Sequence, residues 1–337
     1  MSDSLRFDVA LARAGFGLAM AADVPLRGIT AITGPSGSGK TTLLRILSGL
    51  EPQATGHVQL AGRILQGQGT FVPPHRRGIG YVFQEPRLFP HLNVAGNLAY
   101  GARRRGVGAA RVDEVADLLN LGPLMQRDIR GLSGGEARRV ALGRVMASGP
   151  DILFLDEPLT GLDTARKAEI LPHVTRASQA FGVPALFVSH ARDEVLTLAD
   201  RVLSVADGAI TGWANDPVRL AARVIEQAAG GAVFDVGGAR VTLPVKAAPG
   251  ERWSLTLPVE STLISLADPG PTSGHLTLQG RIAGMTDNHL RLSLAGQNVL
   301  WPLANWPGAA VVGDPVWLTL LAVLPRPEVG RWANDSN

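Results

Sequence analysis

The chain has 337 residues and no cysteine, which excludes disulfides and thiolate metal sites and is consistent with a reducing compartment. Tyrosine occurs twice, and only three of the 32 basic residues are lysine. No apolar stretch approaches the roughly 18 residues of a membrane-spanning helix, so the sequence predicts no such helix. The first segment, MSDSLRFDVALARAG, lacks the charged head and unbroken apolar core of a secretory signal.

Charge is nearly balanced, with a net charge of +3. The one local exception is a basic cluster made of Arg103, Arg104, Arg105 and Arg111. We interpret this cluster as the solvated face of a helix, with contact to anionic lipid or nucleic acid as the alternative. We therefore expect no nucleic-acid partner.

The segment GPSGSGKT at 34–41 has the pattern of a phosphate-binding loop, G-x-x-x-x-G-K-[ST]. Its glycines let several amide N–H groups point inward at phosphates, and a helix starting near Lys40 adds the positive end of its dipole. Lys40 is the point charge for the terminal phosphates, and Thr41 is the hydroxyl for Mg²⁺. A glycine-rich linker is the alternative, but the apolar strand pattern before the loop and the helix pattern after it favour a phosphate site. The predicted ATP-binding residues here are Gly34, Pro35, Ser36, Gly37, Ser38, Gly39, Lys40, Thr41 and Thr42.

The segment ILFLDEP at 152–158 predicts a short buried strand that delivers two carboxylates at its polar end. We expect Asp156 to hold Mg²⁺, directly or through water, and Glu157 to orient and deprotonate the attacking water. Paired carboxylates can instead cap a helix, since acidic residues favour first turns. The glycine loop upstream favours the catalytic interpretation.

The segment LSGGE at 132–136 contains the capping-box pattern S-x-x-E, with Ser133 and Glu136 opening a helix. A capped helix start with two glycines exposes backbone N–H groups, which makes it a second phosphate-binding terminus in the same chain. A plain helix cap after a flexible turn is the alternative.

In this order, these segments resemble those of ATP-binding cassette (ABC) ATPases, whose signature loop is usually LSGGQ. The chain departs from that motif at Glu136, which the capping argument tolerates because either side chain can fill the third helical position. The resemblance implies that Ser133 and Gly135 contact the γ-phosphate of ATP held by a second subunit. It adds Ser133, Gly134, Gly135 and Glu136 to the predicted ATP site.

Other residues gain roles from the same resemblance. Gln84, in YVFQEPRLFPHL, matches the family's glutamine that touches Mg²⁺ or the lytic water, and TGLD at 160–163 matches a loop that crosses between subunits. His190, in FVSHARDE, matches the histidine that contacts the γ-phosphate; alone it would indicate only a satisfied strand-end residue. Phe16 is the candidate for stacking on adenine, with core packing as the alternative.

The predicted fold is an α/β P-loop cassette with a helical insert, followed by a small all-β barrel of TOBE or OB type. We place the cassette at 1–214, its helical part at about 88–148, a linker at 215–229, the barrel at 230–327 and a flexible tail at 328–337. The barrel prediction depends on short apolar alternations separated by glycine and proline, including a Gly-Gly hairpin signal at 237–238.

Two classes of ABC ATPase compete for this sequence, an importer motor and a soluble non-transport ATPase. The soluble classes carry either long coiled-coil insertions or two cassettes, whereas this chain has one set of motifs and no sustained heptads. The stretch at 82–101 and the Glu at position 136 are similar to the molybdate importer subfamily. Sulfate, ferric iron, polyamine and sugar importers stay open as alternatives, since specificity lies mainly in other subunits.

The resemblance also implies partners and a location. It implies a homodimer that encloses two ATP molecules with Mg²⁺, an integral membrane permease seated near residues 84–98, and indirectly a solute-binding protein. The expected location is the cytoplasmic face of the inner membrane, as a peripheral subunit.

Overall fold

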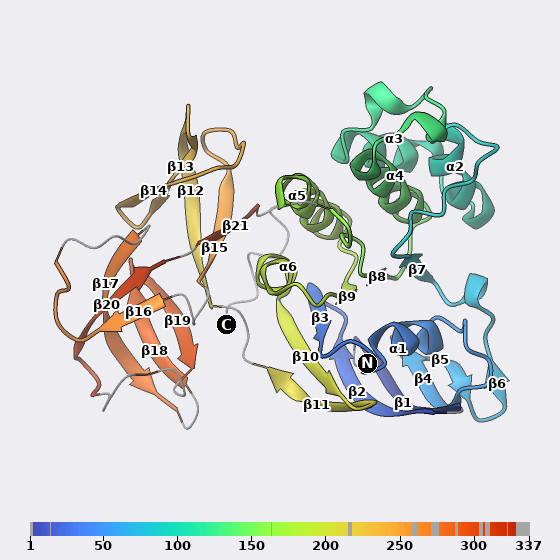
Figure 1. The fold of residues 1–337 in the computed structure, drawn as a ribbon, viewed down its shortest axis with the longest axis horizontal. Helices are drawn as coiled ribbons and strands as arrows, with labels where there is room; N and C mark the ends of the chain where they lie inside the picture. The colour runs from blue at the N-terminus through green and yellow to red at the C-terminus, as the bar shows by residue number, and fades with distance from the viewer. Residues whose placement is uncertain are drawn as a thin grey trace. The chain divides into compact units, whose positions relative to one another are not determined.

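The computed structural model describes residues 3–13, 15–162, 164–214, 218–257, 262–270, 276–286, 289–302, 306, 311–321 and 323–327. The chain divides into two compact units. The first contains residues 1–214 together with 330–337, and the second contains residues 215–329. Figure 1 gives the element labels used below. The expected tail at 328–337 lies outside the described residues.

A six-stranded sheet forms the centre of the first unit, in the order β11-β10-β3-β9-β8-β7. Five of its strands are parallel and β11 is antiparallel. The strands are β3 (Ile29–Thr33), β7 (Ile79–Val82), β8 (Ile152–Asp156), β9 (Ala185–Val188), β10 (Arg201–Ala206) and β11 (Ala209–Ala214). Every residue of β8 and β9 is buried, because helices or a second sheet cover both faces of a parallel sheet and leave no solvent face.

A five-stranded antiparallel sheet packs in the same unit, in the order β2-β1-β4-β5-β6. Its strands are β1 (Ser4–Arg13), β2 (Phe16–Pro25), β4 (Thr55–Leu60), β5 (Arg63–Gly67) and β6 (Thr70–Phe71), followed by the 3₁₀ turn η1 (Pro74–Arg76). Buried and exposed residues alternate along β1, as expected for a sheet with one face on a core. That core also contains the apolar face of α1 (Lys40–Leu47), which therefore anchors the phosphate loop from behind.

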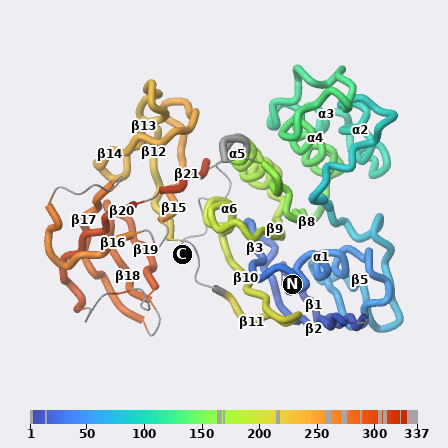
Figure 2. The backbone as a smooth tube through the Cα atoms, viewed as in Figure 1, coloured from blue at the N-terminus to red at the C-terminus, as the bar shows by residue number. Residues whose placement is uncertain are grey.

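The remaining helices share the other core of this unit. They are α2 (Val94–Arg105), α3 (Ala109–Leu118), α4 (Gly134–Ala147), α5 (Thr164–Phe181) and α6 (Arg192–Leu198), with the 3₁₀ turns η2 (Gly122–Leu124) and η3 (Ile129–Gly131). Figure 1 shows α2, α3 and α4 grouped together, and the trace in Figure 2 shows α5 beside α6. Among the described residues, no helix has the length and apolar character needed to cross a membrane.

The basic cluster on α2 and α3 is only partly a solvated face. Arg103, Arg104 and Arg105 are exposed as expected. Arg111 departs from the expectation, because its guanidinium lies 4.0 Å from the ring centre of Phe181 and its Nε donates to the Met146 carbonyl oxygen at 3.3 Å. A guanidinium is attracted to the face of an aromatic ring, and that tertiary partner is not visible in local sequence.

The second unit is all-β, as the sequence predicts, and its strands form two antiparallel five-stranded sheets. One has the order β14-β13-β12-β15-β21 and contains β12 (Val218–Ala228), β13 (Gly231–Val236), β14 (Ala239–Leu243), β15 (Arg252–Leu257) and β21 (Leu324–Pro327). The other has the order β16-β20-β17-β18-β19 and contains β16 (Thr262–Ser265), β17 (Leu276–Met285), β18 (His289–Leu294), β19 (Gln297–Pro302) and β20 (Pro315–Leu320). Both sheets contribute to one apolar core.

The expected linker at 215–229 is wrong for residues 218–228, which form β12, the middle strand of the first of these sheets. Its buried residues alternate with less buried ones over VRLAARV, so the period is that of a strand. The Gly-Gly hairpin is confirmed: Gly237 and Gly238 both have positive φ and join β13 to β14, with Val236 paired to Ala239.

Candidate functional site

Four of the predicted motifs leave the six-stranded sheet at the same edge. The register pairs Ile32 of β3 with Val188 of β9, Asp156 of β8 with the same Val188, and Val82 of β7 with Leu155 of β8. The phosphate loop, Glu157, His190 and Gln84 follow these strands directly in the chain. Because the carboxyl ends of parallel strands form one edge, the fold gathers segments up to about 160 residues apart at the place where α/β sheets bind ligands.

The phosphate loop has the backbone that its glycines were predicted to allow. Gly34, Gly37 and Gly39 have φ values of 153°, 81° and 98°. A Cβ on Gly34 would lie 1.9 Å from the Val205 carbonyl oxygen, so only glycine fits there. Lys40 opens α1 behind the loop, as the strand-loop-helix pattern predicts.

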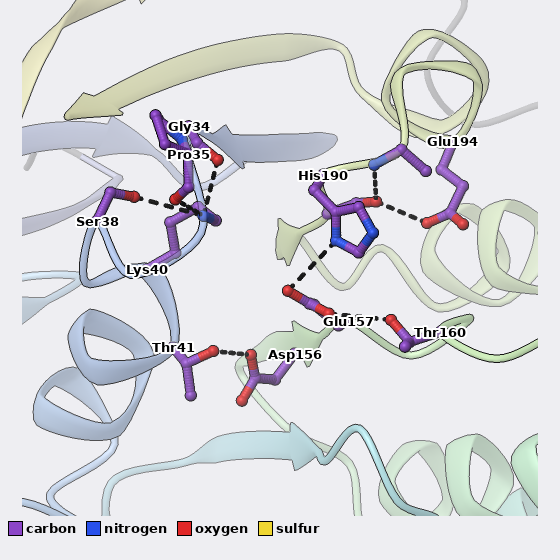
Figure 3. A network of polar contacts seen from close by, with 12 residues as sticks. Gly34, Pro35, Ser38, Lys40, Thr41, Asp156, Glu157, Thr160, His190 and Glu194 are labelled. Carbon is purple, nitrogen blue, oxygen red and sulfur yellow. Dashed lines mark hydrogen bonds and ion pairs between the residues drawn. The ribbon is translucent and has the colours of Figure 1, made fainter.

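The ammonium group of Lys40 lies inside the loop (Figure 3). Its Nζ donates to the carbonyl oxygens of Gly34 at 2.8 Å and Pro35 at 2.7 Å, and to Ser38 Oγ at 3.4 Å. Burial lowers the pKa of this ammonium group, and the negative charge of Glu157 acts in the opposite direction. A buried cation held by neutral carbonyls has a strong electrostatic reason to accept a phosphate oxygen as partner.

Asp156, the last residue of β8, connects the loop helix α1 to the neighbouring strand β7. Its Oδ1 accepts from Thr41 Oγ1 at 2.7 Å, and its Oδ2 accepts from the Tyr81 hydroxyl at 2.8 Å. Burial, followed by the charge of Asp156, raises the pKa of the Tyr81 phenol, so Tyr81 stays protonated and donates. Sequence reasoning missed Tyr81, although it is one of two tyrosines and comes three residues before Gln84.

Glu157 and His190 face each other across the sheet edge (Figure 3). Glu157 Oε1 lies 3.5 Å from His190 Nδ1, and its Oε2 accepts from Thr160 Oγ1 at 3.0 Å. The backbone of Glu157 has a φ of 44°, a conformation that costs free energy for a residue with a Cβ. Both residues therefore lie where the sequence predicted them. Of the loop at 160–163, Asp163 lies outside the described residues.

The signature segment has the predicted capping box. Glu136 N donates to Ser133 Oγ at 3.3 Å and Ser133 N donates to Glu136 Oε2 at 2.7 Å, with Ser133 as the N-cap of α4. The second carboxylate oxygen of Glu136 accepts from Arg127 Nη1 at 3.2 Å, a bond that explains glutamate at this position. Hydrogen bonds from Ser133, first from its backbone, lower the pKa of Glu136, and Arg127 lowers it further.

In the described chain, Ser133, Glu136 and Gln84 make no hydrogen bond to the phosphate loop, Asp156 or Glu157. The hydrogen bonds of Ser133 and Glu136 go to each other and to Arg127, so the structure does not join the signature segment to the phosphate loop of its own chain. Gln84 is exposed just after β7. These placements leave their roles as predictions.

Phe16 lies beside the phosphate loop. Its Cζ is 3.3 Å from the position that a Cβ on Gly39 would occupy, and the side chain is half-buried at the edge of the neighbouring core. The ring therefore packs partly on the core and borders the loop at once. Stacking on adenine stays a prediction.

Comparisons with known proteins agree with this geometry. A family model described as ABC transporter matches residues 19–160. A solved structure of cbiO1 from Clostridium perfringens, part of an ABC transporter complex, shares the fold with a TM-score of 0.57 and 24% identity, over 64% of this chain and 89% of that one. The chain belongs to the ATP-binding proteins of the ABC transporter family.

Within that family the chain is similar to molybdenum import ATP-binding proteins. It is 38% identical over 303 residues to the one from Rhizobium johnstonii, covering 81% of this chain and 85% of that one. It is 50% identical over 196 residues to the one from Thiobacillus denitrificans, covering 58% of this chain. The chain spans between 54% and 58% of the length of that relative and three others like it.

Proposed function

We propose that the chain is the ATP-binding and ATP-hydrolysing subunit of an importer. The observation that carries the proposal is the joint position of Lys40, Thr41, Asp156, Glu157 and His190 at one sheet edge, with the contacts given above. A phosphate cradle, an oxygen donor pair and a carboxylate base are the parts that hydrolysis of a phosphoanhydride needs. The relatives, which are named as import ATP-binding proteins, support the same activity.

The oxygen donors fit Mg²⁺. Thr41 Oγ1 and Asp156 Oδ1 lie 2.7 Å apart, and both are hard oxygen ligands of the kind this ion prefers. Mg²⁺, when bound, neutralises phosphate charge. Thr41 and Asp156 would hold it, and Tyr81 would fix the orientation of the Asp156 carboxylate through its hydrogen bond.

Glu157 is the proposed general base. Thr160 donates to one oxygen of its carboxylate and His190 lies near the other, so the group is oriented toward the ligand side of the sheet edge. In that position Glu157 takes a proton from the attacking water, while Lys40 holds the terminal phosphates. His190, whose side chain is 58% exposed, can turn toward the same phosphate group.

We further propose that two copies complete each site. The start of α4, with Ser133 as cap and Gly134 and Gly135 in the first turn, presents backbone N–H groups to an anion. The contacts of the described chain leave this terminus apart from its own phosphate loop, so a second copy is the natural source of the phosphate it binds. In a head-to-tail dimer each ATP then lies between the loop of one copy and the signature segment of the other.

The solute is proposed to be molybdate or a related oxyanion, because the similar proteins are named for molybdenum import. An integral membrane permease, and indirectly a solute-binding protein, would complete the transporter, with this chain as its peripheral subunit on the cytoplasmic face. The second unit, from 215 on, is proposed as an accessory domain.

The test is ATP hydrolysis with Mg²⁺ by the purified chain, followed by reconstitution with the permease from the same source in vesicles. Stimulation of hydrolysis by solute-binding protein loaded with molybdate or tungstate supports the proposal. If sulfate, ferric iron, a polyamine or a sugar stimulates hydrolysis and molybdate and tungstate do not, the chain belongs to one of the alternative importers. A chain that hydrolyses no ATP contradicts the enzymatic part.

A further inference from the structure

A buried carboxylate lies behind the turn that carries His190, outside the set of residues assigned above. Glu194, in α6, is 4% exposed. Its Oε2 accepts from Ser189 Oγ at 2.7 Å, and its Oε1 pairs with Lys167 Nζ of α5 at 2.7 Å. The carboxylate thus connects the turn after β9 to a helix that begins elsewhere in the chain.

Ser189 passes this connection to the backbone of the turn. While its hydroxyl donates to Glu194, its Oγ accepts from Ala191 N at 3.0 Å. Of the two neighbours of His190, Ser189 is therefore bonded to the buried carboxylate directly, and Ala191 is connected to it through the Ser189 hydroxyl. The imidazole itself lies on the open side of the turn, 58% exposed and 3.5 Å from Glu157.

The pair with Lys167 holds this carboxylate in place. A buried carboxylate that loses its cationic partner is strongly destabilised, because the desolvation of the charge is no longer offset. Lys167 is one of three lysines in the chain, and α5, which carries it, begins at Thr164 directly after the loop at 160–163. The ion pair therefore links that loop's helix to the histidine turn.

We propose that Lys167 and Glu194 are positioning residues that hold the His190 turn in register with Glu157. The proposal rests on the ATP-hydrolysing function proposed above. Neither side chain takes part in the hydrogen bonds between Lys40 and the phosphate loop. Loss of the pair should therefore change the placement of His190 and leave nucleotide binding by the loop unchanged. A misplacement of about 1 Å near reacting groups can lower a rate by about a hundredfold. A smaller displacement of the His190 turn should therefore lower the rate of ATP hydrolysis by about tenfold.

The kinetic test compares Lys167→Met and Glu194→Gln with wild type. Both variants remove the ion pair with little change in volume, and Glu194→Gln does so without leaving a carboxylate unpaired, which keeps the test decisive if Lys167→Met is unstable. We expect kcat to fall about tenfold while the Kd for ATP changes less than about twofold. Lys167→Arg should restore most of the rate. Arg6→Met, which breaks the half-exposed pair with Asp23, is the matched control.

A positioning role is separated from a general structural one by combining each variant with His190→Ala. If the pair acts through His190, its removal adds less than about twofold in that background. Equal losses with and without His190 overturn the proposal, as does an unchanged kcat in both single variants.

A second readout needs no hydrolysis. The chain has seven histidines, and His190→Ala identifies the imidazole signals of His190 in ¹⁵N NMR spectra. Lys167→Met and Glu194→Gln should shift or broaden those signals, and Arg6→Met should leave them in place. Unchanged His190 signals in both pair variants overturn this inference even in a chain that hydrolyses ATP. An inactive wild type would contradict the proposed function instead, with the spectra still deciding the positioning role.

Discussion

Tyr81 donates a hydrogen bond of 2.8 Å to Asp156 from the neighbouring parallel strand. The bond occupies one carboxylate oxygen and leaves the other facing Thr41, which sets the direction in which Asp156 would offer a ligand to the proposed Mg²⁺. The relationship depends on strand register, since Tyr81 pairs with Phe154, two residues before Asp156. It makes Tyr81 a support for the carboxylate that we propose as a Mg²⁺ ligand.

Removal of the Tyr81 hydrogen bond should weaken the binding of Mg²⁺. In Tyr81→Phe the buried Asp156 oxygen loses its donor, a change worth about 1 to 3 kcal/mol. We expect the Mg²⁺ concentration for half-maximal ATP hydrolysis to rise about tenfold, in line with the effect of lost outer-shell partners on metal affinity. Tyr100→Phe, at the only other tyrosine, is the control. The same Mg²⁺ curve for wild type and Tyr81→Phe would show that the bond has no part in metal binding.

Glu157→Gln tests the base. Because a positioned general base is worth roughly 10² to 10⁴ in rate, hydrolysis should fall at least about a hundredfold while ATP binding is preserved. Gln keeps the acceptor for Thr160, so the turn should retain its shape. Glu114→Gln, at an exposed position on α3, serves as control. Light scattering should also show an ATP-dependent dimer of the variant. Undiminished turnover would remove Glu157 from its role.

A mixed dimer tests whether Ser133 acts across subunits. In a heterodimer of Lys40→Ala and Ser133→Arg copies, both lesions meet in one site and the other site keeps its full set of residues. Nucleotide binding should therefore survive at one site of the heterodimer, whereas each homodimer carries damage in both. If Ser133 is only the cap of its own helix, the Ser133→Arg homodimer will instead bind nucleotide at both of its sites, like wild type.

The Glu136 carboxylate gives a pH-dependent prediction. Its folded-state pKa is lowered from 4.5, so its contribution to stability is present above that value and is lost as pH falls through the folded-state pKa. Glu136→Gln keeps the capping box and loses the charge toward Arg127, so the cost near pH 7 should stay below about 1 kcal/mol for a group near solvent. Urea unfolding should show that the difference in free energy of unfolding between wild type and Glu136→Gln is smaller at pH 3 than at pH 7. A difference that grows in acid would reverse the assigned sign.

The parts of the site that sequence could predict are those set by local pattern. The strand-loop-helix pattern around Lys40, the carboxylates after the apolar run of β8, and the capping box at Ser133 each follow from adjacent residues. Tyr81 could not be found this way, because its role depends on which strand pairs with which. The same holds for Arg111, whose partner Phe181 lies at the end of a helix 70 residues on.

The strand β12 shows a different limit. The segment VRLAARVIEQ contains good helix formers such as Leu, Ala and Arg, so local propensity argues against a strand. The segment forms a strand despite this propensity, because both neighbours, β13 and β15, pair with it along its length and one of its faces is buried. Tertiary pairing, invisible in one sequence, decides such ambiguous segments.

The last prediction concerns the second unit. The cores of the first unit contain only residues up to Val205, and the core of the second begins at Val218, so each unit has an apolar interior of its own. A chain ending at Ala214 should therefore fold, keep the six-stranded sheet edge intact and bind ATP with an unchanged Kd. Loss of ATP binding on truncation would show that the first unit depends on the second.

Calorimetry of the intact protein with molybdate, tungstate and sulfate then asks what the second unit does. If it holds an anion site, molybdate and tungstate give heat with the intact chain, and the truncated chain gives none. If it serves only to widen a dimer interface, truncation weakens association and no anion gives heat with either chain. Sulfate separates a site for tetrahedral oxyanions in general from one that selects the larger pair. Absence of heat with all three anions would leave molybdate import supported by similarity to the relatives alone.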